Sequence, residues 1–198
     1  MDIHGKYLII RHSIREPITD AKDSYRQLLT PEGIELAKTL GKAVSLYSDT
    51  FTFFHSPVPR CEQTATSIKD GIEINAKQTV NIRPFEPLKG FFYRNWDYCA
   101  ELMNTQEFTK KWFANEIPPE FIMPIKEAGE KMLNDITSIK DDSTTKIFIT
   151  HDWNIFCLRS LFFNSFEEME VPTYLEGILV SGDKKLLQTF KQEHFINK

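Results

Sequence analysis

Short apolar runs alternate with amphipathic stretches along most of this chain. The runs that we expect to be strands are 7–10, 51–54, 79–82 and 147–149. After the first run, apolar residues recur at helical spacing at Ile34, Ala37, Leu40, Val44 and Tyr47. Alternation of strands and helices predicts an α/β fold, a three-layer α/β/α sandwich whose mostly parallel central sheet carries helices on both faces.

Local signals place several element ends. Thr30-Pro31-Glu32 combines a hydroxyl cap, a proline and an acid, which predicts a helix start. A long helix is expected to run to about residue 140, and another from about 154 to 163. A hairpin is expected to turn at Gly182-Asp183.

The stretch 84–124 departs from this rhythm, because it holds five of the ten prolines. It also carries an aromatic cluster, made of Phe85, Phe91, Phe92, Tyr93, Trp96 and Tyr98. We interpret this stretch as an insertion or cap over the sheet. Since no shift in composition marks a second unit, one domain is expected over residues 1–198.

Charge and cysteine content narrow the function classes. A net charge of -4 argues against nucleic-acid or acidic-membrane partners, which usually recruit a basic face. The three cysteines, Cys61, Cys99 and Cys157, are odd in number and widely spaced, so they indicate a reducing compartment. No run of about 18 apolar residues exists, and the N-terminus leads directly into a strand. A cytoplasmic protein is therefore expected.

Polar groups follow three of the apolar runs. Arg11-His12 and Arg15 follow the first, Ser56-Pro57 and Arg60 the second, and His151-Asp152 the last. Because the carboxyl ends of parallel strands share one edge of the sheet, where ligands bind in such folds, these groups are expected to converge.

The converging residue types suit phosphoryl transfer. Guanidinium groups match the oxygens of a phosphate and stay charged, which favours Arg11, Arg15 and Arg60 as its ligands. Their positive field favours a neutral His12, and a neutral imidazole nitrogen can attack phosphorus. These residues predict catalysis through a phosphohistidine at His12, with no cofactor.

Two further roles complete the scheme. His151 can donate to the equatorial oxygens of the phosphoryl group, and Asp152 can protonate the leaving oxygen. A metal site built on the two histidines and Asp152 is the weaker alternative, because the arginines would repel a cation. No metal is expected.

The same strings resemble the three signature places of the histidine phosphatase superfamily. They are 11–17 (RHSIREP), 56–65 (SPVPRCEQTA) and 151–154 (HDWN), together with the first helix start at 29–33 (LTPEG). The resemblance implies a phosphoglycerate-mutase-like sandwich that works without metal. It also implies a phosphohistidine at His12 and a phosphate pocket of Arg11, Arg15, Arg60 and His151.

The proton donor depends on the branch. The Arg-His-x-x-Arg-x-Pro and His-Asp-x-Asn strings resemble the acid phosphatase branch, in which the aspartate after the second histidine is the acid, here Asp152. In the mutase-like branch the acid is a glutamate from the middle insertion, which makes Glu86 the alternative donor. Ser13 stands where the family usually has glycine and is expected to crowd the nucleophile.

The sequence therefore predicts a phosphomonoesterase that acts on a small phosphorylated substrate. Two alternatives are a phosphoglycerate-mutase-like phosphotransferase and a non-catalytic module that binds a phosphate ligand or a partner. Other phosphate chemistries leave no trace in the chain, which has no G-x-x-x-x-G-K-[ST] loop and no cysteine followed by five residues and an arginine.

Overall fold

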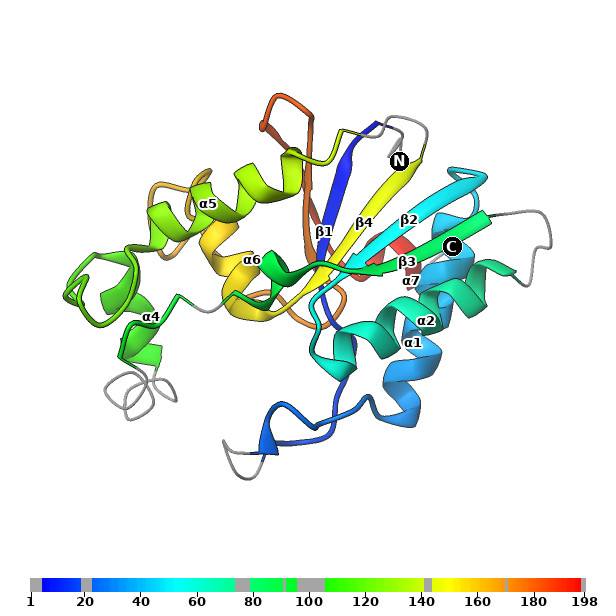
Figure 1. Ribbon diagram of the computed structural model, residues 1–198, viewed down its shortest axis with the longest axis horizontal. Helices are drawn as coiled ribbons and strands as arrows, with labels where there is room; N and C mark the ends of the chain where they lie inside the picture. Colours follow the sequence, from blue (N-terminus) through cyan, green and yellow to red (C-terminus); the bar gives the residue numbers. More distant parts are fainter. Residues whose placement is uncertain are drawn as a thin grey trace.

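A computed structural model describes residues 5–18, 23–73, 79–90, 92–95, 106–140, 144–169 and 171–196 (Figure 1). Four residues of the sequence analysis lie outside these ranges, namely Phe91, Trp96, Tyr98 and Cys99. None of the helices in the described ranges is long and apolar enough to cross a membrane.

A six-stranded sheet forms the centre of the molecule, in the order β3-β2-β4-β1-β5-β6. Its strands are β1 (Tyr7–Arg11), β2 (Thr50–His55), β3 (Thr79–Pro84), β4 (Thr145–Thr150), β5 (Gly177–Val180) and β6 (Leu186–Phe190). The first four in chain order pair in parallel, whereas β5 and β6 are antiparallel to their neighbours. The predicted hairpin joins β5 to β6, and the mostly parallel α/β fold is confirmed.

Helices connect these strands. They are α1 (Pro31–Val44), α2 (Pro59–Glu73), the 3-10 helix η2 (Glu86–Lys89), α4 (Gln106–Phe113), α5 (Ile125–Thr137), α6 (Asp152–Arg159) and α7 (Glu193–Ile196). The predicted cap of α1 is confirmed, because Thr30 Oγ1 accepts a hydrogen bond of 3.0 Å from the Gly33 amide. The predicted range of α6 is wrong at both ends. It begins two residues earlier, because the His151 carbonyl already accepts the amides of Asn154 and Ile155.

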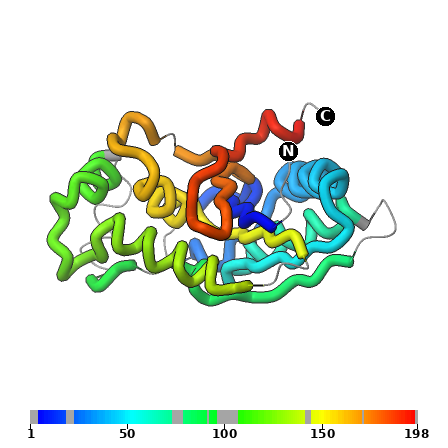
Figure 2. The backbone as a smooth tube through the Cα atoms, turned by 90° about the horizontal axis from the view of Figure 1, so that it is seen from above, coloured from blue at the N-terminus to red at the C-terminus, as the bar shows by residue number. Residues whose placement is uncertain are grey.

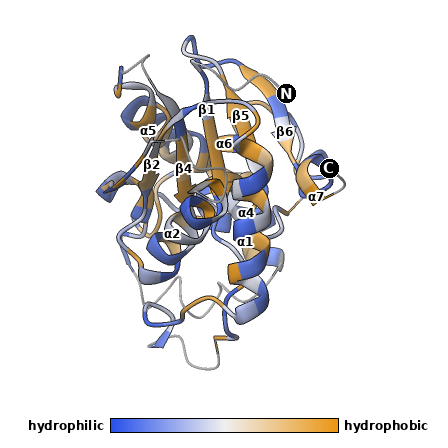
Figure 3. Ribbon diagram, turned by 90° about the vertical axis from the view of Figure 1, so that its right-hand side faces the viewer, coloured by the Kyte–Doolittle hydropathy of each residue, from blue (hydrophilic) through white to orange (hydrophobic). Residues whose placement is uncertain are grey.

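Both faces of the sheet are buried along its inner strands β1, β2, β4 and β5. Along β1, Leu8 and Ile10 pack with residues of α1, α2 and α7, whereas Tyr7 and Ile9 pack with residues of α4, α5 and α6. Successive side chains of a strand point to opposite faces, so this single strand contributes to two cores. Figure 2 shows α1 (light blue) and α6 (yellow) on opposite sides of the molecule, and Figure 3 shows that the strands between them are largely apolar.

The described part of 84–124 packs against the start of α6. Phe108 and Trp112 are buried, and their rings lie 5.3 and 5.6 Å from the ring of Trp153. The indole of Trp112 also donates to the Met123 carbonyl at 2.8 Å. These aromatic side chains therefore support the segment that directly follows His151.

Candidate active site

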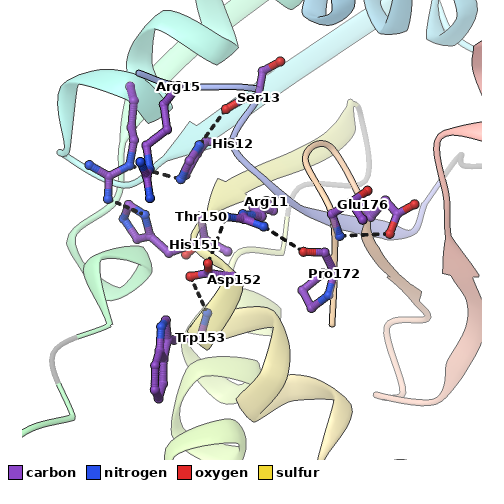
Figure 4. A network of polar contacts seen from close by, with 12 residues as sticks. Arg11, His12, Ser13, Arg15, Thr150, His151, Asp152, Trp153, Pro172 and Glu176 are labelled. Atoms are coloured by element: carbon purple, nitrogen blue, oxygen red, sulfur yellow. Dashed lines mark hydrogen bonds and ion pairs between the residues drawn. The ribbon is translucent and has the colours of Figure 1, made fainter. Parts of the chain in front are cut away.

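The carboxyl ends of β1, β2 and β4 bring the predicted groups together. The His12 amide donates to the Thr150 carbonyl at 2.8 Å, and the Ser56 amide donates to the Ile149 carbonyl at 2.9 Å. The rings of His12 and His151 consequently lie 5.5 Å apart, centroid to centroid (Figure 4). The convergence expected from the strand ends is present.

The hydrogen bonds of His12 fix the position of its proton. Its Nδ1 lies 2.8 Å from the Ser13 carbonyl oxygen, which can only accept, so Nδ1 carries the proton. Nε2 then holds the lone pair and accepts a hydrogen bond of 3.1 Å from Arg60 Nε. His12 is buried, so its ring is held in this orientation with Nε2 toward the arginine.

Both imidazoles are neutral at neutral pH. Burial, followed by the neighbouring His151 and Arg60, lowers the pKa of His12 well below 6.5. Burial, followed by the charges of Arg60, Arg11 and Arg15, lowers the pKa of His151 to about 3. The expected neutral state of His12 thus has burial as its largest cause, and the charge of Arg60 adds to it.

Arg60 links the two histidines. Besides Nε, its Nη2 donates to His151 Nδ1 at 3.2 Å, and its Nη1 donates to the Ser24 carbonyl at 2.7 Å. All three nitrogens of the guanidinium are therefore engaged. In this resting arrangement Arg60 covers the lone pair of His12.

Arg11 and Asp152 form an ion pair, with 2.9 Å between Nη2 and Oδ2. Arg11 Nη1 donates to the Pro172 carbonyl at 2.9 Å, and its guanidinium lies 4.3 Å from the ring centroid of Tyr174. Asp152 Oδ1 accepts from the Trp153 amide at 2.9 Å. Asp152 is thus held between Arg11 and the first turn of α6.

The remaining two candidates differ in their contacts. Arg15 Nη1 donates to the Glu16 carbonyl. Burial is the largest cause that lowers the pKa values of His151 and Arg60, and the charge of Arg15 adds to it. The side chain of Glu86 is 73% exposed and lies 3.6 Å from Lys89. Glu86 also lines a surface cavity between η2 and α5.

Ser13 does not crowd the nucleophile, contrary to expectation. Its Oγ donates to the Gly33 carbonyl in α1 at 2.7 Å, so the hydroxyl is held by α1. Its amide donates to Thr64 Oγ1 in α2 at 3.1 Å. Ser13 therefore ties the turn after β1 to both helices on that face.

Tyr174 was not among the predicted site residues, yet its ring lies 5.8 Å from that of His12. This residue precedes β5, which runs antiparallel beside β1, with Gly177 opposite Ile10. An antiparallel strand begins at the edge where its parallel neighbours end. Recognising the direction of β5 would have revealed this residue.

Two further observations concern other chemistries. In the residues that the structure covers, no group of three or more His, Cys, Asp or Glu side chains could hold a metal ion. The Cys61 thiol lies 3.8 Å from His151 Nε2, and burial raises its pKa to about 12. Cys61 therefore stays a thiol beside the histidine.

The comparison with protein families agrees with the fold and with this cluster. Residues 8–170 match the family model of the histidine phosphatase superfamily (branch 1). The chain belongs to this superfamily. The matching model is that of branch 1, whereas the resemblance to the acid phosphatase branch rests on the short strings at 11–17 and 151–154.

Solved structures of the same fold cover nearly the whole chain. A phosphoserine phosphatase from Entamoeba histolytica, in complex with 3-phosphoglyceric acid, has a TM-score of 0.62 and 18% identity over 96% of this chain and 99% of its own. A mycobacterial glucosyl-3-phosphoglycerate phosphatase has a TM-score of 0.57 and 9% identity over 92% and 96%. A phosphoglycerate mutase from Bacillus anthracis str. Sterne has a TM-score of 0.56 and 14% identity over 96% and 94%. No curated protein matches the chain significantly.

Proposed function

We propose that this protein is a phosphomonoesterase that hydrolyses a small phosphorylated substrate through a phosphohistidine at His12. The observation that supports this most is the state of His12, whose Nε2 is unprotonated and faces the guanidinium of Arg60. A neutral imidazole beside fixed positive charges is a nucleophile suited to an anionic phosphoryl group.

In the first step, the lone pair of His12 Nε2 forms the N–P bond while the bond from phosphorus to the leaving oxygen breaks. Arg60 covers this lone pair at 3.1 Å, so its guanidinium has to turn toward the phosphoryl oxygens first. Arg11 and Arg15 supply further positive charge around those oxygens, and His151 borders the same space. Such preorganised donors stabilise the charge that develops in the transition state.

The leaving oxygen takes its proton from a carboxylic acid, for which we favour Asp152. Asp152 is paired with Arg11 in the resting site, so this ion pair has to open before the carboxylate gains a proton. A phosphoryl dianion that attracts Arg11 would favour this exchange. Glu86 is the alternative donor, from η2 beyond the end of β3.

In the second step, water attacks phosphorus and gives a proton to the same carboxylate. The N–P bond breaks, inorganic phosphate leaves, and His12 Nε2 regains its lone pair. A mutase would return the phosphoryl group to a sugar acid at this point.

The proposal includes a cytoplasmic location, which suits the buried free thiols of Cys61 and Cys157.

The test is hydrolysis of an aryl phosphate by the purified protein with a chelator present and no metal added. We expect release of the phenol together with inorganic phosphate, abolished by His12→Ala and retained by His194→Ala, a control in α7. Retained turnover in His12→Ala would exclude His12 as the nucleophile. Phosphoryl transfer to a sugar acid, stimulated by a bisphosphorylated primer, would indicate a mutase instead.

A further inference from the structure

The hydrogen bonds around His151 determine which of its nitrogens carries the proton. Arg60 Nη2 lies 3.2 Å from His151 Nδ1, and a guanidinium can only donate, so Nδ1 is an acceptor. Because the ring is neutral, its one proton is on Nε2. Nε2 lies 3.0 Å from Ser56 Oγ, which therefore accepts this proton.

Ser56 is placed so that its hydroxyl has little freedom. It directly follows β2, its amide is bonded to the Ile149 carbonyl of β4, and the whole residue is buried. Its hydroxyl also interacts with the thiol of Cys61. Two neighbouring strands thus fix the position of Oγ relative to the His151 ring.

We propose that Ser56 is the positioning residue that holds the ring of His151 by accepting a hydrogen bond from its Nε2–H, with Nδ1 presented to the phosphoryl site as an acceptor. Arg60, which can only donate, selects this tautomer, whereas a serine hydroxyl can pair with either one. Arg60 in turn contacts Nε2 of His12. Ser56 therefore aligns Arg60 with the nucleophile through His151.

One consequence concerns proton transfer and rests on the proposed function. The Nε2 proton of His151 is committed to Ser56. Any proton that His151 donates to a phosphoryl oxygen therefore has to be gained first at Nδ1. His151 therefore enters the reaction as a hydrogen-bond acceptor at Nδ1.

A competing role for Ser56 is to cap the turn into α2, since the Val58 amide lies 3.5 Å from Oγ. A cap would affect only stability, whereas a positioning residue also affects the imidazole of His151. The ¹⁵N spectrum of the imidazole nitrogens distinguishes the two roles. Protonated and unprotonated ring nitrogens resonate far apart, and the resonance of a ring N–H also depends on the hydrogen bond that it donates. It needs no substrate and no activity.

In the ligand-free wild-type protein, we expect His151 to show a protonated Nε2 and an unprotonated Nδ1. In Ser56→Ala, we expect the Nε2 resonance of His151 to move, because the Nε2–H has lost its acceptor, while Nδ1 stays unprotonated beside Arg60. The matched control is Ser67→Ala, which removes a buried hydroxyl in α2. In the described contacts this hydroxyl donates only to the Gln63 carbonyl. A wild-type pattern for His151 in Ser56→Ala, or a protonated Nδ1 in the wild type, would overturn the proposal.

The kinetic test uses the aryl phosphate assay. Loss of the partner that orients a functional imidazole typically lowers activity about 10- to 100-fold, and we expect this loss in kcat for Ser56→Ala, with KM changed less. Ser56→Thr restores a hydroxyl and should recover most of kcat, whereas Ser67→Ala should retain it. Unchanged kcat in Ser56→Ala would contradict the positioning role. If the wild type has no turnover, the proposed function fails and the ¹⁵N result still decides the tautomer.

Discussion

Acidification should destabilise the folded protein through its neutral histidines, and His151 gives the clearest case. In the unfolded chain a histidine takes up a proton near pH 6.5, whereas the folded pKa of His151 is about 3. Between these values the unfolded state binds one more proton than the folded state. The free energy of unfolding therefore falls as the pH decreases below about 6.5, by about 1.4 kcal/mol per pH unit for one histidine.

The perturbation is His151→Gln, which removes this titration and keeps a neutral polar side chain. Between pH 7 and pH 5, wild type should lose about 2 kcal/mol more than the variant, because the unfolded histidine is only partly protonated at the start of this interval. The free energy of unfolding is measured in urea, with tryptophan fluorescence as the signal, at several pH values for both proteins.

Above pH 7.5 the difference between the two proteins should be constant, which serves as the internal control. Burial is the largest cause of the lowered pKa, so added salt should change the slope little. A wild-type minus variant difference that stays constant down to pH 5 would refute the assignment of His151 as a neutral buried imidazole.

Three other predictions concern the site and the helix packing. Arg60→Lys keeps the charge but replaces three directed donors by one ammonium, so kcat/KM for the aryl phosphate should fall about 100-fold; an unchanged value would contradict the bridging role. Asp152→Asn should slow the hydrolysis of an alkyl phosphate about 10²–10⁴-fold, and that of an aryl phosphate less, because a phenol leaves with less help from an acid. If Glu86→Gln shows this pattern and Asp152→Asn does not, the proton donor is Glu86 in η2. Gly71→Ala should lower the free energy of unfolding by about 1–3 kcal/mol, and with it the thermal midpoint, because the new Cβ would lie 2.1 Å from a backbone oxygen of α1. An unchanged midpoint in calorimetry would contradict this close contact between α1 and α2.

The sequence was sufficient for the parts of the fold that depend on periodicity. The runs that became β1, β2 and β4 are short and mostly apolar, whereas β3 alternates apolar and polar residues, and all four pair in parallel as predicted. The cap at Thr30 could be predicted because it is made by residues close in sequence. The place of His12 and His151 at one edge followed from the same strand ends.

Contacts that depend on tertiary geometry could not be predicted in this way. The ion pair of Arg11 with Asp152 depends on side-chain torsions that are set after β1 and β4 have paired. Tyr174 reaches the site only because β5 runs antiparallel to β1, and an apolar run does not show its direction. Ser56 could be read as a cap, whereas its partner His151 comes from another strand end.

The central claim is that His12 carries the phosphoryl group during turnover. The most direct measurement is a rapid alkaline quench of the protein with an aryl phosphate, followed by peptide mass spectrometry. We expect a phosphoryl group on the peptide that contains His12, labile in acid and absent in His12→Ala, with more of it in Asp152→Asn if water activation is slowed. Rapid hydrolysis in the wild type, with no phosphorylated His12 in either protein, would contradict the account.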